Sequence, residues 1–313
     1  MADYKVIMSG NGGTIKLPES PEPQTNFTSH TFTNCGQTGR FGPSQSQCIS
    51  EYNGTEILSP EFSFSVTNGI QSWTVPVDGT YKIEAWGAQG GSVGSYTGGL
   101  GAKAEKELIL NSGDVVKILV GQVGTAAENG SGGGGGSYVV LENTPLVIAG
   151  GGGGAHSRSD RGARNGYPGK NSESGGNSSV TTGACNSTGT GGASGNSGGG
   201  GCAGGGAGWL DNGGNGAQGT HAGLGGLNFF SDGTGGDSIS PNGKPYGGFG
   251  GGGAGSPRSG YGGGGGGYSG GGGGNYNSQL NRAGVGGGGG SIGDNNQTGA
   301  NSGHGSVKIT IIE

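Results

Sequence analysis

The sequence contains no long apolar run. None of its apolar segments approaches the roughly 20 residues that a membrane-spanning helix requires, so we expect no membrane insertion. The first residues, from Met1 to Lys5, also lack the basic and hydrophobic regions of a signal peptide. If the chain acts outside a cell, we expect release by lysis, a dedicated secretion route, or earlier removal of a leader.

Charged residues are scarce as well. They make up 11% of the chain, and the formal net charge is −5. A nucleic-acid-binding domain usually carries a basic patch that neutralises phosphates. This composition therefore argues against nucleic acid as a partner.

Cysteine is nearly absent. The chain has four, Cys35, Cys48, Cys185 and Cys202, which allow two bridges in three possible connectivities. We prefer the two local pairs, Cys35–Cys48 and Cys185–Cys202, although all four can also remain reduced thiols. Neither pair has the C-x-x-C spacing of a zinc site and the four histidines are dispersed, so we predict no metal site.

Catalytic motifs are missing too. Matches to G-x-G-x-x-G are expected by chance in so glycine-rich a chain, and neither Gly169-Lys170 nor Gly243-Lys244 has the preceding glycine of a P-loop. Carboxylates are sparse, and no Ser, Cys or His lies in a recognisable nucleophile motif. We therefore predict no catalytic residue, no cofactor and no enzymatic activity.

Glycine, in contrast, accounts for 88 of the 313 residues. It is concentrated in runs of similar length, at residues 132–136, 150–154, 198–201, 250–253, 262–267, 270–274 and 286–290. The absence of a G-X-Y period excludes collagen. In polyproline II geometry a run of five or six residues forms a straight rod of about 15 to 19 Å. Because glycine has no Cβ, such rods can approach until N–H groups of one donate to carbonyls of the next.

Two interpretations of the glycine runs are open. Chains rich in Gly, Pro and Ser without a period are usually flexible. The matched lengths of the runs and the β-patterned segments around them favour an ordered bundle of polyglycine II helices, in which the backbone itself is the core.

Alternating apolar and polar residues predict β-strands. They occupy residues 70–77, 81–85, 103–110, 115–120, 138–141, 146–149 and 306–312. We expect the first two to form a β-hairpin around Asp78-Gly79, and no helix longer than a turn or two. The predicted fold is all-β, an antiparallel β-sandwich. Residues 31–154 plus 303–313 would form it, 155–302 would be a glycine-rich insertion, and 1–30 an N-terminal arm with a possible strand at 4–8.

Several motifs resemble a known extracellular domain. They are Phe32-Thr33-Asn34-Cys35-Gly36, Cys48, Gly69 to Pro76 with Trp73, Trp86 to Gly91, Ile118 to Gln122, Pro145 to Ala149, Gly262 to Tyr268 and Gly303 to Val307. Their order is similar to that in the glycine-rich domain of the anaplastic lymphoma kinase and leukocyte tyrosine kinase receptors, and to glycine-rich proteins of bacteria and phages. The resemblance implies a tumour-necrosis-factor-like sandwich with an inserted polyglycine II bundle, a Cys35–Cys48 bridge, and trimers. No kinase signature such as H-R-D or D-F-G occurs.

Two groups of residues are candidates for binding. One is aromatic and comprises Trp209, Phe229, Phe230, Tyr246, Phe249, Tyr261, Tyr268 and Tyr276; such rings are common anchors for proteins and sugars, but they can equally cap the glycine bundle. The other is the basic segment His156, Arg158, Arg161, Arg164 and Lys170. It could contact an acidic glycan or phosphate, or be a solvated loop.

The resulting hypothesis is a non-enzymatic virion or extracellular protein. In its main form the chain is a phage tail-fibre adhesin, docked to other virion proteins through residues 1–30 and contacting a glycan or protein on the host. One alternative is a structural coat, capsid-decoration or filament subunit without a ligand. The other is a receptor-like module that binds a polypeptide partner.

Overall fold

The computed structural model describes residues 27–59, 62–181, 185, 189–217, 221–241, 243–258 and 260–313. The strand expected at residues 4–8, and the arm 1–30 apart from its last four positions, lie outside these ranges. Within them, no helix has the length and apolar character that crossing a lipid bilayer would require.

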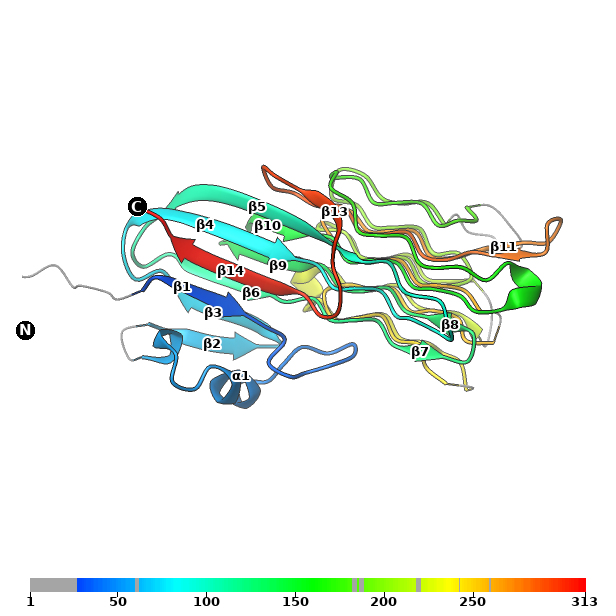
Figure 1. The fold of residues 1–313 in the computed structure, drawn as a ribbon, viewed down its shortest axis with the longest axis horizontal. Helices are drawn as coiled ribbons and strands as arrows, with labels where there is room; N and C mark the ends of the chain where they lie inside the picture. The colour runs from blue at the N-terminus through cyan, green and yellow to red at the C-terminus, as the bar shows by residue number, and fades with distance from the viewer. Residues whose placement is uncertain are drawn as a thin grey trace, which may run out of the picture.

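Two five-stranded antiparallel sheets form the body of the molecule (Figure 1). Sheet A has the order β1 (Ser29–Phe32), β14 (Ser306–Ile311), β4 (Gly79–Trp86), β5 (Gly101–Leu110) and β13 (Gln297–Asn301). Sheet B has the order β10 (Thr144–Ala149), β9 (Ser137–Leu141), β6 (Val115–Leu119), β3 (Ile70–Thr74) and β2 (Phe64–Thr67). The all-β, antiparallel prediction is confirmed.

Short elements complete the described chain. They are α1 (Gln45–Glu51), the 3-10 turns η1 (Glu56–Leu58), η2 (Ser159–Arg161) and η4 (Phe229–Ser231), and the two-residue pairs β7 (Ala126–Ala127) with β8 (Gly130–Ser131) and β11 (Tyr276–Asn277) with β12 (Arg282–Ala283). Helix α1 begins with a capping box, in which the Ser44 side chain accepts from the Gln47 N–H and the Gln47 side chain binds the Ser44 backbone.

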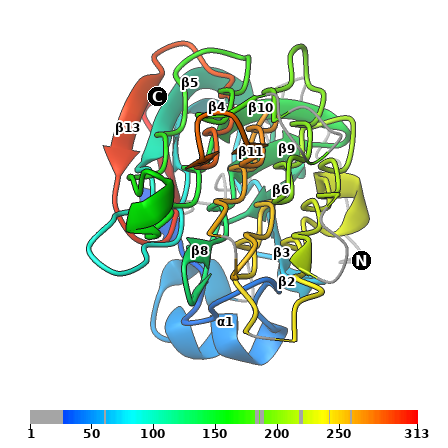
Figure 2. The same ribbon diagram turned by 90° about the vertical axis from the view of Figure 1, so that its right-hand side faces the viewer.

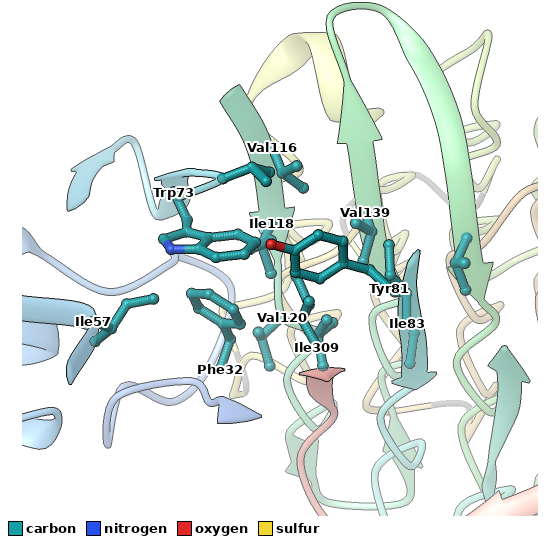
Figure 3. Close-up of a cluster of buried hydrophobic side chains, with 14 of the residues drawn as sticks. Phe32, Ile57, Trp73, Tyr81, Ile83, Val116, Ile118, Val120, Val139 and Ile309 are labelled. Carbon is teal, nitrogen blue, oxygen red and sulfur yellow. The ribbon is translucent and has the colours of Figure 1, made fainter. Parts of the chain in front are cut away.

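The core of the sandwich lies between the two sheets. Because side chains alternate along a strand, Trp73 and Ile118 of sheet B point toward Tyr81 and Ile309 of sheet A, and all four are fully buried (Figure 3). The rings of Trp73 and Tyr81 lie 6.2 Å apart in an edge-to-face arrangement. Burial of each such side chain stabilises the fold by about 1.5 to 3 kcal/mol.

The hairpin expected around Asp78-Gly79 is wrong. Strand β3 pairs with β2 and β6, whereas β4 pairs with β14 and β5, so the two belong to different sheets. The connecting segment crosses the sandwich, held by the Val75 N–H donating to the Asp114 carbonyl and the Tyr81 hydroxyl donating to the Val77 carbonyl. The alternation of apolar and polar residues identified β3 and β4 as strands. It could not show whether two consecutive strands pair within one sheet or lie in the two facing sheets of a sandwich.

The predicted closing strand is confirmed as β14, which lies between β1 and β4. Strands β1, β2 and β13 were not predicted. Strand β13 lies within residues 155–302 and pairs with β5, while the glycine runs at 132–136 and 150–154 bond to runs beyond residue 250. The division of the chain at residues 154 and 302 stays a prediction.

The glycine runs hydrogen-bond to one another with a period of three. The N–H groups of Gly151 and Gly154 donate to Gly266 and Gly263 of one neighbouring run, and those of the two residues between them donate to Ala88 and Tyr167 of other segments. Successive donors therefore point to different neighbours and return to the same neighbour after three residues. A helix with three residues per turn predicts this rotation, and the polyglycine II conformation itself stays a prediction.

Run 262–267 lies in the middle of this array, which we call the glycine lattice. Its N–H groups donate to segments around 131, 134, 204, 284 and 287, and its carbonyls accept from segments around 154, 253 and 271. A Cβ added at Gly265 would overlap the carbonyl oxygen of Gly151, and one at Gly264 would overlap that of Gly271. The spacing of the lattice therefore requires glycine.

Both preferred disulfides, Cys35–Cys48 and Cys185–Cys202, are present. The loop closed by Cys35–Cys48 contacts the glycine lattice. The carbonyls of Gly39 and Arg40 accept from the N–H groups of Phe249 and Gly235, and the Arg40 guanidinium lies 2.6 Å from the Asp237 carboxylate. This loop adds a contact between sandwich and lattice to the direct connections made by β9 and β10, which adjoin the glycine runs 132–136 and 150–154.

Candidate functional site

The eight candidate aromatic residues do not form one patch. Trp209, Phe229 and Phe249 are buried against Tyr138 and its neighbours on the outer face of sheet B, with Tyr268 partly buried beside them. Tyr261 is buried against the Cys185–Cys202 disulfide, with Tyr276 partly buried beside it. Tyr246 lies under Arg40, 5.7 Å from the guanidinium to the ring centroid. Of the eight, only Phe230 is more than half exposed, at 53%.

Phe230 lies in a compact surface cluster that we call the tryptophan patch, made of Trp209, Leu210, Phe229, Phe230 and Tyr268. Its ring centroid is 4.7 Å from that of Trp209 and 5.8 Å from that of Phe229. Leu210, which the sequence did not single out, follows Trp209 in the chain and is 56% exposed. The patch therefore presents two large apolar side chains to solvent above buried rings.

Local hydrogen bonds hold the tryptophan patch in place. The Asn228 side chain accepts from the Ser231 N–H, which caps η4, and donates to the Leu210 carbonyl at 3.0 Å. The Trp209 N–H donates to the Tyr268 carbonyl. Phe229 packs on Tyr138 of β9, 5.9 Å between ring centroids, so the next residue of the 3-10 turn, Phe230, faces outward.

The candidate arginines lie elsewhere, around η2. Figure 1 shows η2 at the end of the molecule opposite the C-terminus, and Figure 2 shows η2 and η4 on opposite flanks. Arg158 pairs with Asp160 at 2.6 Å, Arg161 donates to the Tyr261 hydroxyl at 3.2 Å, and the Arg164 backbone pairs with that of His156. Lys170, the last residue of the predicted basic segment, instead hydrogen-bonds through its backbone N–H to Gly289.

Buried His156 organises this segment. Its Nδ1 accepts from the Arg158 N–H at 3.2 Å, which places the proton on Nε2, 3.4 Å from the Arg161 carbonyl oxygen. Burial lowers the pKa of His156; the hydrogen bond to the Arg161 carbonyl opposes this shift, and the charges of the three neighbouring arginines add to it. The imidazole is therefore neutral at neutral pH and acts as a support for the loop. Within the described residues, no group of His, Cys, Asp and Glu is arranged to hold a metal ion.

Comparison with known proteins finds similarity over part of the chain. The leukocyte tyrosine kinase receptor of Mus musculus is 35% identical over 109 residues, which are 34% of this chain and 12% of the receptor. The chain thus corresponds to only a small part of that receptor's length. No family model matches the chain.

Proposed function

We propose that this chain is an extracellular, non-enzymatic module that binds a polypeptide partner through the tryptophan patch. The observation that carries the proposal is the pair Phe230 and Leu210, exposed by 53% and 56% beside a nearly buried Trp209. Rigid aromatic anchors surrounded by packed rings are typical of the centres of protein–protein interfaces. Phe229 packs on Tyr138, and the Asn228 side chain joins the loop of Phe230 to the loop of Leu210. Because the tryptophan patch is ordered before it binds, it loses little side-chain entropy on binding.

Two further observations support this function. The leukocyte tyrosine kinase receptor, which is similar to part of this chain, is a receptor by name. Of the three functions expected from the sequence, a receptor-like module agrees best with this similarity. Two disulfides are formed, and such bonds persist mainly in oxidising, extracellular compartments. Neither the fold nor the comparison supports a virion location, a tail-fibre role or a glycan ligand.

A displayed library of random peptides, selected on the intact protein, tests the proposal. Enriched peptides should bind wild type, and Phe230→Ala should weaken them by about 2 kcal/mol, a factor of about 30. Leu210→Ala should act in the same direction. Titration calorimetry with the most enriched peptide gives the affinities.

The matched control is Ile109→Ala on β5, because Ile109 is 73% exposed and lies in the sandwich. This variant should change the affinity by less than about twofold, as surface substitutions away from an interface do. Peptides that bind wild type and Phe230→Ala equally well would exclude the tryptophan patch as the binding surface.

A further inference from the structure

Five of the six arginines in the chain gather at one end of the glycine lattice. Arg158, Arg161 and Arg164 come from the η2 segment, Arg258 from the turn before Tyr261, and Arg282 from β12. We call these five the arginine end. Figure 2 views the molecule from this end, with η2, β8 and β11 toward the viewer.

Direct contacts join the three segments that carry these arginines. The Arg158 guanidinium donates to the Arg258 carbonyl at 3.4 Å, and the Asn281 amide, next to Arg282, donates to the Asp160 carbonyl at 3.0 Å. A Cβ placed at Gly162 would lie 3.8 Å from both Arg164 Nη2 and Arg282 Cγ. The five arginines therefore form one surface although more than a hundred positions separate the first from the last.

Positive charge dominates this surface. The carboxylates on these segments and on the adjoining β7–β8 turn are Asp160 and Glu128, two against five arginines. Among the described residues, only Arg158 of the five forms an ion pair, and the guanidinium groups of Arg258 and Arg282 have neither an ion pair nor a hydrogen bond. In a chain of net charge −5, this concentration creates a local field that attracts anions.

The surface also contains apolar anchors. The Arg161 guanidinium lies 4.8 Å from the ring centroid of Tyr276, which fixes it in a cation–π contact. Leu280, at the tip of the β11–β12 hairpin, is 64% exposed. Arginine and tyrosine are enriched in protein interfaces, and an exposed leucine offers nothing to a sulfated sugar. The guanidinium fork itself matches carboxylates in a bidentate manner.

We infer that the arginine end is a second binding surface, separate from the tryptophan patch, and that it binds an acidic polypeptide segment containing apolar residues. Carboxylates of the segment pair with Arg164, Arg258 and Arg282, while its apolar side chains contact Leu280 and Tyr276. Arg158 and Arg161 are held by Asp160 and by the tyrosines, and they keep the surface rigid.

The test uses a fluorescein-labelled peptide rich in glutamate and containing leucine, together with its glutamine counterpart, and fluorescence anisotropy with the full chain. The protein should bind the glutamate peptide and not the glutamine peptide. The triple variant Arg164→Gln, Arg258→Gln and Arg282→Gln should weaken binding about tenfold, because each exposed ion pair contributes a factor of about two. Leu280→Ala should weaken it a few-fold.

The matched control removes three charges from the sandwich, as Lys106→Gln, Lys117→Gln and Lys308→Gln, and should change the affinity by less than about twofold. Equal weakening by both triple variants would overturn the inference, because net charge alone would then explain binding. Binding of dextran sulfate without binding of the glutamate peptide would also overturn the inference, because the surface would then recognise a sulfated sugar and not a polypeptide. Retained affinity of the arginine variant for a peptide selected on the tryptophan patch shows that it is folded and separates the two surfaces.

Discussion

Replacing Gly265 by alanine is expected to lower the free energy of unfolding by at least about 3 kcal/mol. The added methyl group would overlap the carbonyl oxygen of Gly151, a backbone atom that cannot move without shifting its whole run. Gly265 donates to Gly287, and its own carbonyl accepts from Gly271. A shift of this residue therefore breaks hydrogen bonds to two further runs. Chemical denaturation followed by circular dichroism measures the loss.

The control for this variant is Gly176→Ala. Gly176 is also buried and donates to the Gly288 carbonyl, but an added Cβ would meet the flexible end of Lys170 at 3.1 Å and backbone only at 3.4 Å. The lysine side chain can turn aside, so the cost should stay below about 1 kcal/mol. Equal stability of the two alanine variants would show that the runs are not packed as closely as described.

Removing the Cys35–Cys48 disulfide, as Cys35→Ser with Cys48→Ser, is expected to cost about 3 kcal/mol of stability, the loop-closure entropy of about 14 residues. The same change should free the loop from the glycine lattice, because the bridge holds Gly39 and Arg40 against Phe249 and Gly235. Trypsin cuts after arginine, so cleavage at Arg40 reports the release. Limited proteolysis should show rapid cleavage there in the variant and resistance in wild type.

The companion variant, Cys185→Ser with Cys202→Ser, separates the two effects. Its bridge spans 17 positions and packs against Tyr261 at the other side of the lattice, so a similar loss of stability is expected without cleavage at Arg40. If Arg40 is cut equally in both variants, or in neither, the Cys35–Cys48 bridge does not hold its loop against the lattice.

The features that the sequence predicted best are the positions of strands, because these depend on a local pattern of apolar residues. The apolar pattern located β5, β6, β9, β10 and β14. In β6 and β14 burial alternates, so a period of two follows directly, whereas β9 and the end of β10 are buried on both faces and are continuous apolar runs. The pattern missed β2 and β13, whose burial is incomplete on both faces. It also assigned the wrong partner to β4, since pairing depends on contacts between segments far apart in the chain.

Candidate sites were harder to predict for the same reason. The eight aromatic candidates were chosen as one group, but burial divides them, and of the eight only Phe230 is more than half exposed. Arg258 and Arg282 stand alone in the sequence, each within a glycine- and serine-rich stretch. The sequence around Arg258 and Arg282 does not indicate that these two residues lie beside η2. Hydrogen bonds of Arg158 and Asn281 bring them there in the folded chain.

The most direct test of the account is hydrogen exchange at the glycine amides, since the glycine lattice positions both proposed binding surfaces. The N–H groups of Gly264, Gly265 and Gly266 donate to Gly204, Gly287 and Gly134. We expect these amides to exchange as slowly as those of the sandwich core, because opening them requires separation of several runs. Exchange of run 262–267 at the rate of an unstructured chain would contradict the lattice and, with it, the rigid support of the tryptophan patch and the arginine end.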